Sequence, residues 1–199
     1  GATSLKSREL LAYLLLNRDR PHAREKVASR LWGDRCTTAQ SKKYLRNALW
    51  QLQSALSDQA DVGNRPLLFA DPDWIQLNSI PSLHLDVHVF ETAYAAVEGI
   101  PGYTLEEEMA DTLDQALELY LGDLLEGWYQ EWCIYDRERI LQLYLMMLDK
   151  MMIYSEAHRQ FEKGLAYGHH ILRRDRAREC THRRMMRLYY LAGDRSTAL

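Results

Sequence analysis

Cysteine is scarce in this chain, and the sequence patterns that mark common enzyme classes are missing. The 199 residues hold three scattered cysteines, Cys36, Cys133 and Cys180, too few for a disulfide framework or a four-cysteine metal site. The sequence has no glycine-rich phosphate loop, no nucleophile elbow and no HExxH motif. Its histidines match no zinc spacing. We therefore expect a protein that is not an enzyme and that has no catalytic residues, no metal site and no cofactor.

Long hydrophobic runs are missing as well. The longest apolar stretches, such as residues 10–16, fall far short of the roughly 20 residues that cross a bilayer. No charged segment followed by an apolar core opens the chain. These absences predict a cytoplasmic protein with no membrane partner, and no small-molecule substrate is evident. A chain of this length can bury one good core or two modest ones.

Charge is distributed unevenly along the chain, although the net charge is only -3. Residues 1–60 hold 11 Lys/Arg against 5 Asp/Glu, whereas residues 61–160 hold 5 against 19. Residues 161–199 are basic again, with 9 against 4. A basic first block followed by an acidic one indicates that only the amino-terminal part faces a polyanion such as DNA.

Three helices are expected within the first 57 residues. Leucines at helical spacing predict a helix over residues 7–16, and a second should span residues 22–32 and end at a left-handed Gly33. Thr37 and Gln40 have the spacing of a capping box, which predicts that a third helix begins at about Thr38 and runs to about residue 57.

A β-hairpin should follow the three helices. Apolar runs at residues 67–69 and 74–77 flank a turn that contains Asp71, Pro72 and Asp73. Three helices and then a hairpin are the order of a winged helix-turn-helix, in which the third helix enters the major groove of DNA. We expect this domain to span residues 5–80.

The third helix has two chemically different faces. Its apolar stripe should face a core and consists of Leu45, Ala48, Leu49, Leu52 and Leu56. The outer side combines cations, amides, a hydroxyl and an aromatic ring without a carboxylate, and consists of Lys43, Arg46, Asn47, Trp50, Gln51 and Ser54. Such side chains suit phosphates and base edges. A solvated helix face is the alternative, and the surrounding winged-helix order favours DNA.

Particular roles follow for these residues. Lys42, Lys43 and Arg46 are expected to contact phosphates, while Asn47 and Gln51 are expected to reach base edges. Trp50 would pack on a sugar or a thymine methyl group, or else cover a neighbouring domain or subunit, and the second role is slightly favoured. Arginines around the first turn either hold phosphates or are solvated, and they are Arg18, Arg20 and Arg24.

From His84 onward the pattern is helical only. Expected helices start at Asp86, at a capping box of Thr104 and Glu107, and at about residues 130, 159 and 177. Met151 and Met152 recur as Met185 and Met186 after 34 residues, which is the length of a tetratricopeptide repeat. We expect an all-α, tetratricopeptide-like domain over residues 84–199, cut off after the first helix of its second repeat.

Several segments together resemble one family. SRELLAYL at residues 7–14, REKVASRLW at 24–32 and LRNALWQLQSAL at 45–56 are similar to the three helices of an OmpR-like winged helix. Leu85 to Val87 with Phe90 and Glu91, YLGDLLEG at 120–127, Trp132 and residues 136–139 are similar to a bacterial transcriptional activator domain. The chain therefore resembles the SARP-type bacterial transcriptional activators over nearly its whole length.

The sequence departs from that family in a few places. The winged helix usually begins with a small amino-terminal sheet, which we expect to be absent because the chain opens almost directly on its first helix. Gln53 stands where Arg is common, and Arg176 stands where Pro usually follows the residue matching Asp175. The wing holds no Lys or Arg between residues 67 and 80 and carries two aspartates at its tip, which disfavours insertion into the minor groove.

The fold expected from the sequence is thus mainly α, a winged helix-turn-helix with a short hairpin wing followed by helical repeats. The resemblance implies a transcriptional activator that binds double-stranded promoter DNA, with the helical domain serving dimerisation, signal input or contact with RNA polymerase. A homodimer is a further expected partner. The alternative is a protein-interaction module whose winged helix no longer binds DNA, which the acidic wing, Trp50 and the missing sheet would favour.

Overall fold

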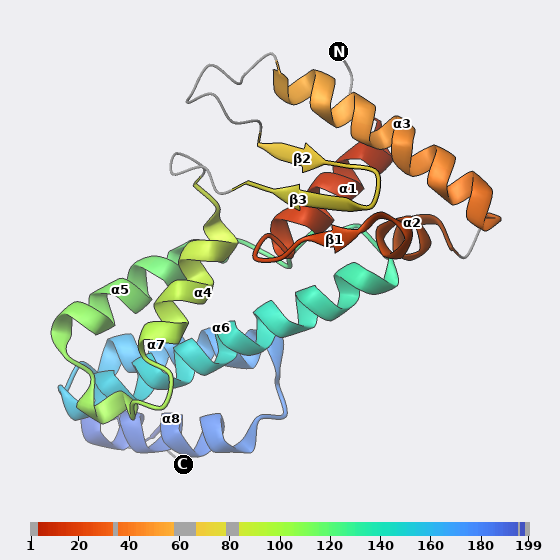
Figure 1. Cartoon of the computed structure of the whole chain (residues 1–199). Helices are drawn as coiled ribbons and strands as arrows, with labels where there is room; N and C mark the ends of the chain where they lie inside the picture. The colour runs from red at the N-terminus through yellow and green to blue at the C-terminus, as the bar shows by residue number, and fades with distance from the viewer. Residues whose placement is uncertain (1–3, 34–35, 58–66, 79–83, 195, 198–199) are drawn as a thin grey trace. The chain divides into compact units, whose positions relative to one another are not determined.

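The computed structural model describes residues 4–33, 36–57, 67–78, 84–194 and 196–197. The protein is mainly helical, with one small antiparallel sheet among the described residues (Figure 1). The chain divides into two compact units, Gly1–His84 and Leu85–Leu199. The expected fold class, a winged helix followed by an all-α helical domain, is confirmed.

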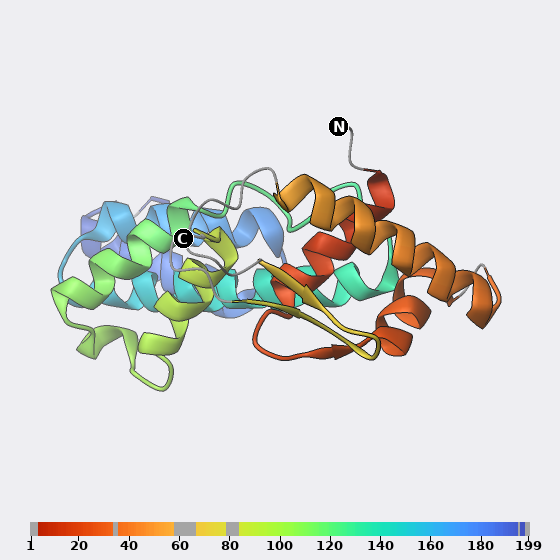
Figure 2. The ribbon, with the colours of Figure 1, turned by 45° about the horizontal axis from the view of Figure 1, so that its top comes forward.

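The first unit contains three helices and three short strands. Their order is α1 (Leu5–Leu16), β1 (His22–Ala23), α2 (Arg24–Trp32), α3 (Thr38–Ser57), β2 (Leu68–Ala70) and β3 (Trp74–Leu77). The hairpin β2–β3 projects beside α3 as the wing (Figure 2). Residues 58–66 and 79–83, which flank the hairpin in the chain, lie outside the described residues.

Side-chain caps fix where α1 and α3 begin. The Ser4 hydroxyl accepts a hydrogen bond from the Ser7 backbone N–H and starts α1. At α3 the Thr37 N–H donates to Gln40 Oε1 (3.1 Å) and the Gln40 N–H donates to Thr37 Oγ1 (3.4 Å). The predicted capping box is therefore confirmed, and α3 begins at Thr38 as expected.

The second helix starts later than predicted because its first two residues join the sheet. The strand order is β1-β3-β2, and His22 pairs with Ile75 in an antiparallel register. The pairing satisfies backbone groups that a helix would otherwise use, so α2 begins at Arg24. Gly33 was also predicted wrongly, since its φ of -58° is right-handed.

The core of the first unit lies between the helices and the inner face of the sheet. The predicted apolar stripe of α3 is buried at Leu45 (1% exposed), Leu49 (3%) and Leu52 (2%), while Leu56 at its end is half-buried. These side chains meet residues of the other elements that are also buried, including Leu10, Leu14, Val27, Leu31, Leu68 and Ile75. Each such side chain contributes about 1.5–3 kcal/mol relative to exposure, which holds α3 in place by its inner face.

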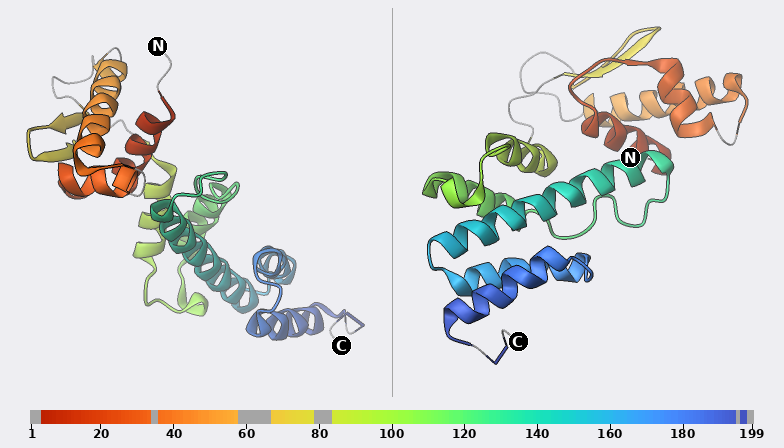
Figure 3. Two further views of the ribbon diagram at one scale, coloured as in Figure 1. Left: turned by 90° about the vertical axis from the view of Figure 1, so that its right-hand side faces the viewer. Right: turned by 90° about the horizontal axis from the view of Figure 1, so that it is seen from below.

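The second unit is built of helices. They are α4 (Asp86–Ala96), the short 3-10 helix η2 (Gly102–Thr104), α5 (Glu107–Glu118), α6 (Glu131–Ala157), α7 (Phe161–Arg174) and α8 (Glu179–Ala192). Helices α6, α7 and α8 lie side by side, each running back along the one before it (Figure 3). None of the helices in the described ranges is long and apolar enough to cross a membrane.

Two glycines let α7 lie very close to its neighbours. A Cβ on Gly164 would be 3.1 Å from a Leu188 methyl group, and one on Gly168 would be 2.7 Å from Cγ of Met185 and 3.2 Å from Cε of Met152. Met152 of α6 and Met185 of α8 thus meet at the same glycine of α7. Of the Met residues that recur after 34 positions, Met151 and Met185 are both buried, whereas Met152 is buried and Met186 is 46% exposed.

The second predicted capping box does not form. Thr104 lies in η2 and donates its hydroxyl to the Pro101 carbonyl (2.9 Å), while α5 starts at Glu107 without a side-chain cap. Packing on α6 explains the difference, because a Cβ on Gly102 would be 2.5 Å from the Lys150 carbonyl oxygen and the Lys150 ammonium donates to the Ile100 carbonyl. These contacts hold residues 100–104 in a tight turn.

Candidate nucleic-acid interface

The outer face of α3 presents polar and cationic side chains from a helix without a single Asp or Glu. Lys43, Arg46 and Asn47 are exposed, and Trp50 is 68% exposed. Because the leucines on the opposite side are buried, this face is turned outward by the packing of the unit itself. The predicted separation of the two faces is confirmed except at Gln51, which is half-buried, and the DNA contacts of these residues stay predictions.

Lys42 lies at the edge of this face and has an intramolecular partner. Its ammonium forms an ion pair with Glu25 of α2, and both side chains are largely solvent-exposed. The hydrogen bond and the charge of Lys42 lower the pKa of Glu25. Exposed pairs of this kind contribute little to stability, so breaking this pair costs little free energy.

Gln51 faces α1. Its Oε1 accepts hydrogen bonds from the hydroxyls of Ser4 (2.8 Å) and Ser7 (2.6 Å), and the side chain is half-buried. Asn47, one turn earlier on α3, is more exposed than Gln51.

The arginines near the first turn differ in their surroundings. Arg20 is exposed, whereas Arg24 donates from its guanidinium to the Asp71 carbonyl (2.7 Å) and from its backbone N–H to the Asp73 carbonyl (2.8 Å). Arg24 thus fastens α2 to the turn of the wing. Arg18 is half-buried and donates to the Leu15 carbonyl at the end of α1.

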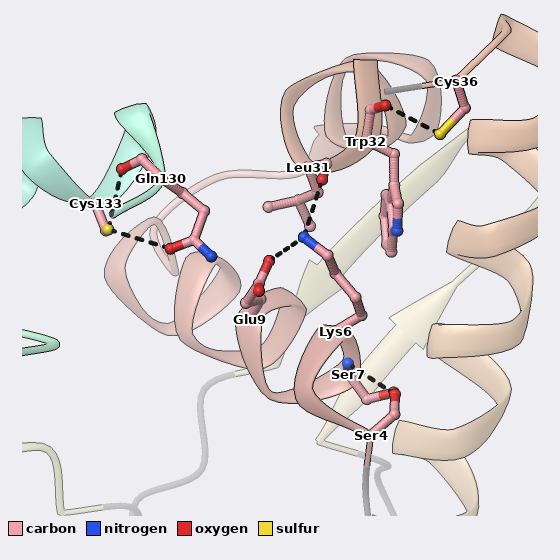
Figure 4. Close-up of polar contacts among 9 residues, drawn as sticks. All are labelled: Ser4, Lys6, Ser7, Glu9, Leu31, Trp32, Cys36, Gln130 and Cys133. Atoms are coloured by element: carbon pink, nitrogen blue, oxygen red, sulfur yellow. Dashed lines mark hydrogen bonds and ion pairs between the residues drawn. The ribbon is translucent and has the colours of Figure 1, made fainter. Parts of the chain in front are cut away.

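A buried carboxylate in α1, not singled out from the sequence, pairs with a lysine that joins α1 to α2. Glu9 is 1% exposed and accepts from the Lys6 ammonium (2.6 Å), which also donates to the Leu31 carbonyl (3.4 Å) (Figure 4). The same ammonium lies 6.0 Å from the centre of the Trp32 ring. The only cue in the sequence is a charged pair three residues apart within a leucine-rich helix.

In the second unit, Arg137 organises the loop before α6. Its guanidinium donates to the carbonyls of Leu124 (2.8 Å), Leu125 (2.7 Å) and Trp128 (2.8 Å). Leu125 has a positive φ of 51°, a strained conformation that these bonds stabilise. Arg137 thus holds the second half of the stretch YLGDLLEG to α6.

An aromatic cluster joins the start of that loop to α6 and α7. Tyr120 stacks on Tyr144 with 4.0 Å between ring centres, and Arg174 lies 5.4 Å from the Tyr120 ring while pairing with Asp123 (3.0 Å). Burial, followed by the charge of Asp123, raises the pKa of Tyr120 to about 12, although Arg174 acts in the opposite direction. The phenol therefore stays neutral.

Residues 85–199, more than half of the sequence, match the family described as the bacterial transcriptional activator domain. The chain belongs to this family. The resemblance to SARP-type bacterial transcriptional activators predicted from the sequence is confirmed. The bacterial transcriptional activator domain coincides with the second compact unit, so Arg137 and the tyrosine stack are features of that domain.

A solved structure is similar to the whole chain. Mycobacterium tuberculosis EmbR, determined in complex with a low-affinity phosphopeptide, superposes with a TM-score of 0.82 at 20% sequence identity. The match covers 100% of this chain and 52% of that one, so the chain spans about half the length of EmbR. At this identity the likeness concerns the fold. No curated protein matches the sequence.

Proposed function

We propose that the first unit binds double-stranded promoter DNA, with α3 in the major groove, and that the chain acts as a transcriptional regulator. The observation that carries this proposal is the outer face of α3, which combines exposed cations and an amide on a helix free of carboxylates. Membership in a transcriptional activator family supports it. Phosphate contacts would supply most of the affinity and base contacts the specificity.

Individual roles follow from exposure and partners. Lys43 and Arg46 would bind phosphates, Asn47 would read a base edge, and Lys42 would exchange Glu25 for a phosphate. Arg20 is free to reach a flanking phosphate, whereas Arg24 would act by holding the wing turn. The proposed DNA-binding domain is the one expected at residues 5–80.

The activator domain would carry the regulatory contacts. Residues 85–199 hold 13 Lys/Arg against 20 Asp/Glu, a balance that would keep this domain away from the duplex. We propose that it serves dimerisation, signal input or contact with RNA polymerase.

Fluorescence anisotropy of a labelled duplex over a salt series tests DNA binding. We expect affinity to fall steeply as salt rises, and Lys43→Ala to weaken binding to all duplexes while reducing the salt slope by about one. Lys163→Ala, an exposed lysine of α7, is the matched control and should change neither. Equal behaviour of the two variants would contradict the proposed contact.

A second function is favoured by one observation. Trp50 exposes 68% of its surface at the centre of α3, and large exposed aromatic side chains are enriched at protein interfaces. In this alternative α3 would bind a second copy of the chain. It would replace the first proposal if the full chain failed to bind any duplex at low salt while Trp50→Ala abolished self-association measured by analytical ultracentrifugation.

A further inference from the structure

Gln51 accepts two short hydrogen bonds that join α3 to α1. Its Oε1 accepts from Ser4 Oγ (2.8 Å) and Ser7 Oγ (2.6 Å) in the first turn of α1. Ser7 is completely buried, and Ser4 is already fixed because it caps α1. The amide oxygen is therefore held by two donors that the fold places independently of Gln51.

This arrangement removes the acceptor that base reading would need. An Asn or Gln side chain recognises adenine through two hydrogen bonds, in which the amide oxygen accepts from N6 and the amide nitrogen donates to N7. With Oε1 engaged by two hydroxyls, Gln51 cannot make that paired contact without breaking the link to α1. Among the described residues, the Asn47 side chain makes no hydrogen bond, so both of its amide groups are available.

The first turn of α1 also contacts α2. Lys6 lies between Ser4 and Ser7 in the sequence, and its ammonium donates to the Leu31 carbonyl in the last turn of α2. One turn of α1 thus holds the end of the helix before α3 and the middle of α3 itself. The direction in which Arg46 and Asn47 point depends on both attachments.

We propose that Gln51 is a positioning residue that fastens α3 to α1, and that base reading belongs to Asn47. The part of this inference that concerns DNA rests on the proposed function. The hydrogen-bonding role of Gln51 does not, so the two can fail separately.

The first arm of the test measures the link without DNA. In the full chain, Gln51→Met, Ser7→Ala and the double variant are compared by hydrogen exchange of the α3 amides. We expect Gln51→Met to reduce protection about three- to tenfold. The double variant should lose no more than Gln51→Met alone, because Gln51→Met already removes the bond that Ser7→Ala removes. Gln51→Glu keeps an acceptor oxygen and should restore protection. The proposal would be overturned if the losses of protection in the two single variants multiplied in the double variant. It would also be overturned if Gln51→Glu failed to restore protection.

The second arm compares duplexes that differ at single base pairs of a selected site. We expect Gln51→Met to weaken all duplexes by the same factor, leaving their ratios unchanged, and Asn47→Ala to flatten the ratios at one position. A lost preference in Gln51→Met would show a base contact and overturn the inference. If no duplex binds the parent chain, the proposed function fails, and the hydrogen-exchange arm still decides whether Gln51 positions α3.

Discussion

Gly168 sits where three helices of the activator domain are closest, and it sets how tightly they pack. In most helices Gly→Ala stabilises the folded state by about 0.5–1 kcal/mol, because Ala loses less backbone entropy on folding than Gly. Here the added methyl group would lie 2.7 Å from Met185 Cγ and 3.2 Å from Met152 Cε, both on neighbouring helices. Overpacking of this kind costs about 1–3 kcal/mol, which exceeds the gain.

We therefore expect Gly168→Ala to lower the free energy of unfolding of the activator domain, measured by denaturant titration. Gly122→Ala is the matched control, because its new methyl group would meet only the Glu126 carboxylate at 3.6 Å, an ordinary contact distance. A Gly168 variant as stable as the Gly122 variant would mean that Met185 moves aside without cost.

Residue-level predictions from the sequence succeeded where a helical period decides them. The period correctly separated buried Leu45, Leu49 and Leu52 from exposed Arg46 and Asn47. It could not assign Gln51, which lies at the border of the two faces and takes its partners from a turn 44 to 47 residues earlier. Local spacing carries no information about such distant hydrogen bonds.

At the scale of single elements, the loop of residues 121–130 depends on Arg137. Three carbonyl oxygens share one guanidinium, a geometry that an ammonium cannot reproduce because it lacks the planar fork of donors. We expect Arg137→Lys to destabilise the activator domain by about 2 kcal/mol, since hydrogen bonds to charged groups each contribute about 1.5–3 kcal/mol.

Arg139→Lys provides the comparison, measured in the same denaturant titrations. Arg139 pairs with Glu91 and Asp136 while 42% of its side chain remains exposed, and exposed pairs of this kind contribute about 0–1 kcal/mol. Similar losses in the two variants would show that the three backbone contacts of Arg137 contribute no more than a surface ion pair.

The two predicted capping boxes show why element boundaries were only partly readable. Thr37 and Gln40 form their reciprocal bonds on an exposed stretch where local hydrogen bonds decide the conformation. Thr104 and Glu107 have the same spacing but lie beside Gly102, which packs against the backbone of α6. Tertiary packing overrode the local signal there, as the sheet did at His22 and Ala23.

At the scale of the whole molecule, His170 gives the activator domain a dependence on pH. Its Nδ1 lies 3.2 Å from the Tyr144 hydroxyl, and partial burial, followed by the charges of Arg173 and His169, lowers the pKa of its imidazole. As pH falls, the His170 imidazole therefore takes up a proton in the unfolded chain at a higher pH than in the folded chain. Stability is therefore fully present above the ordinary histidine pKa of about 6.5 and falls as pH decreases below it.

We expect the midpoint of thermal unfolding to fall between about pH 6.5 and pH 5, and His170→Gln to make that fall shallower. His84→Gln, at an exposed position before α4, serves as the control and should leave the pH profile unchanged. If His170→Gln left the dependence of the unfolding midpoint on pH unchanged, other groups would be responsible for it.

The overall architecture was largely accessible from the sequence. Helical periods and the hairpin turn each predicted part of the observed fold. Of the Met residues that recur after 34 positions, Met151 and Met185 are both buried. The strand β1 was not accessible, because two residues show no period and their pairing partners are distant. Which side chains contact DNA depends on a partner and stays a prediction.

The pairing of β1 with β3 also has a consequence for how the chain folds. His22 meets Ile75, 53 residues later, so the three-stranded sheet requires the closure of a long loop. Helices α6, α7 and α8 instead meet neighbours joined by connections of a few residues. Since contacts close in sequence form faster than distant ones, we expect the helical hairpins to appear early in refolding and the sheet last. On the ribosome, the wing cannot close until residues 74–77 have left the exit tunnel.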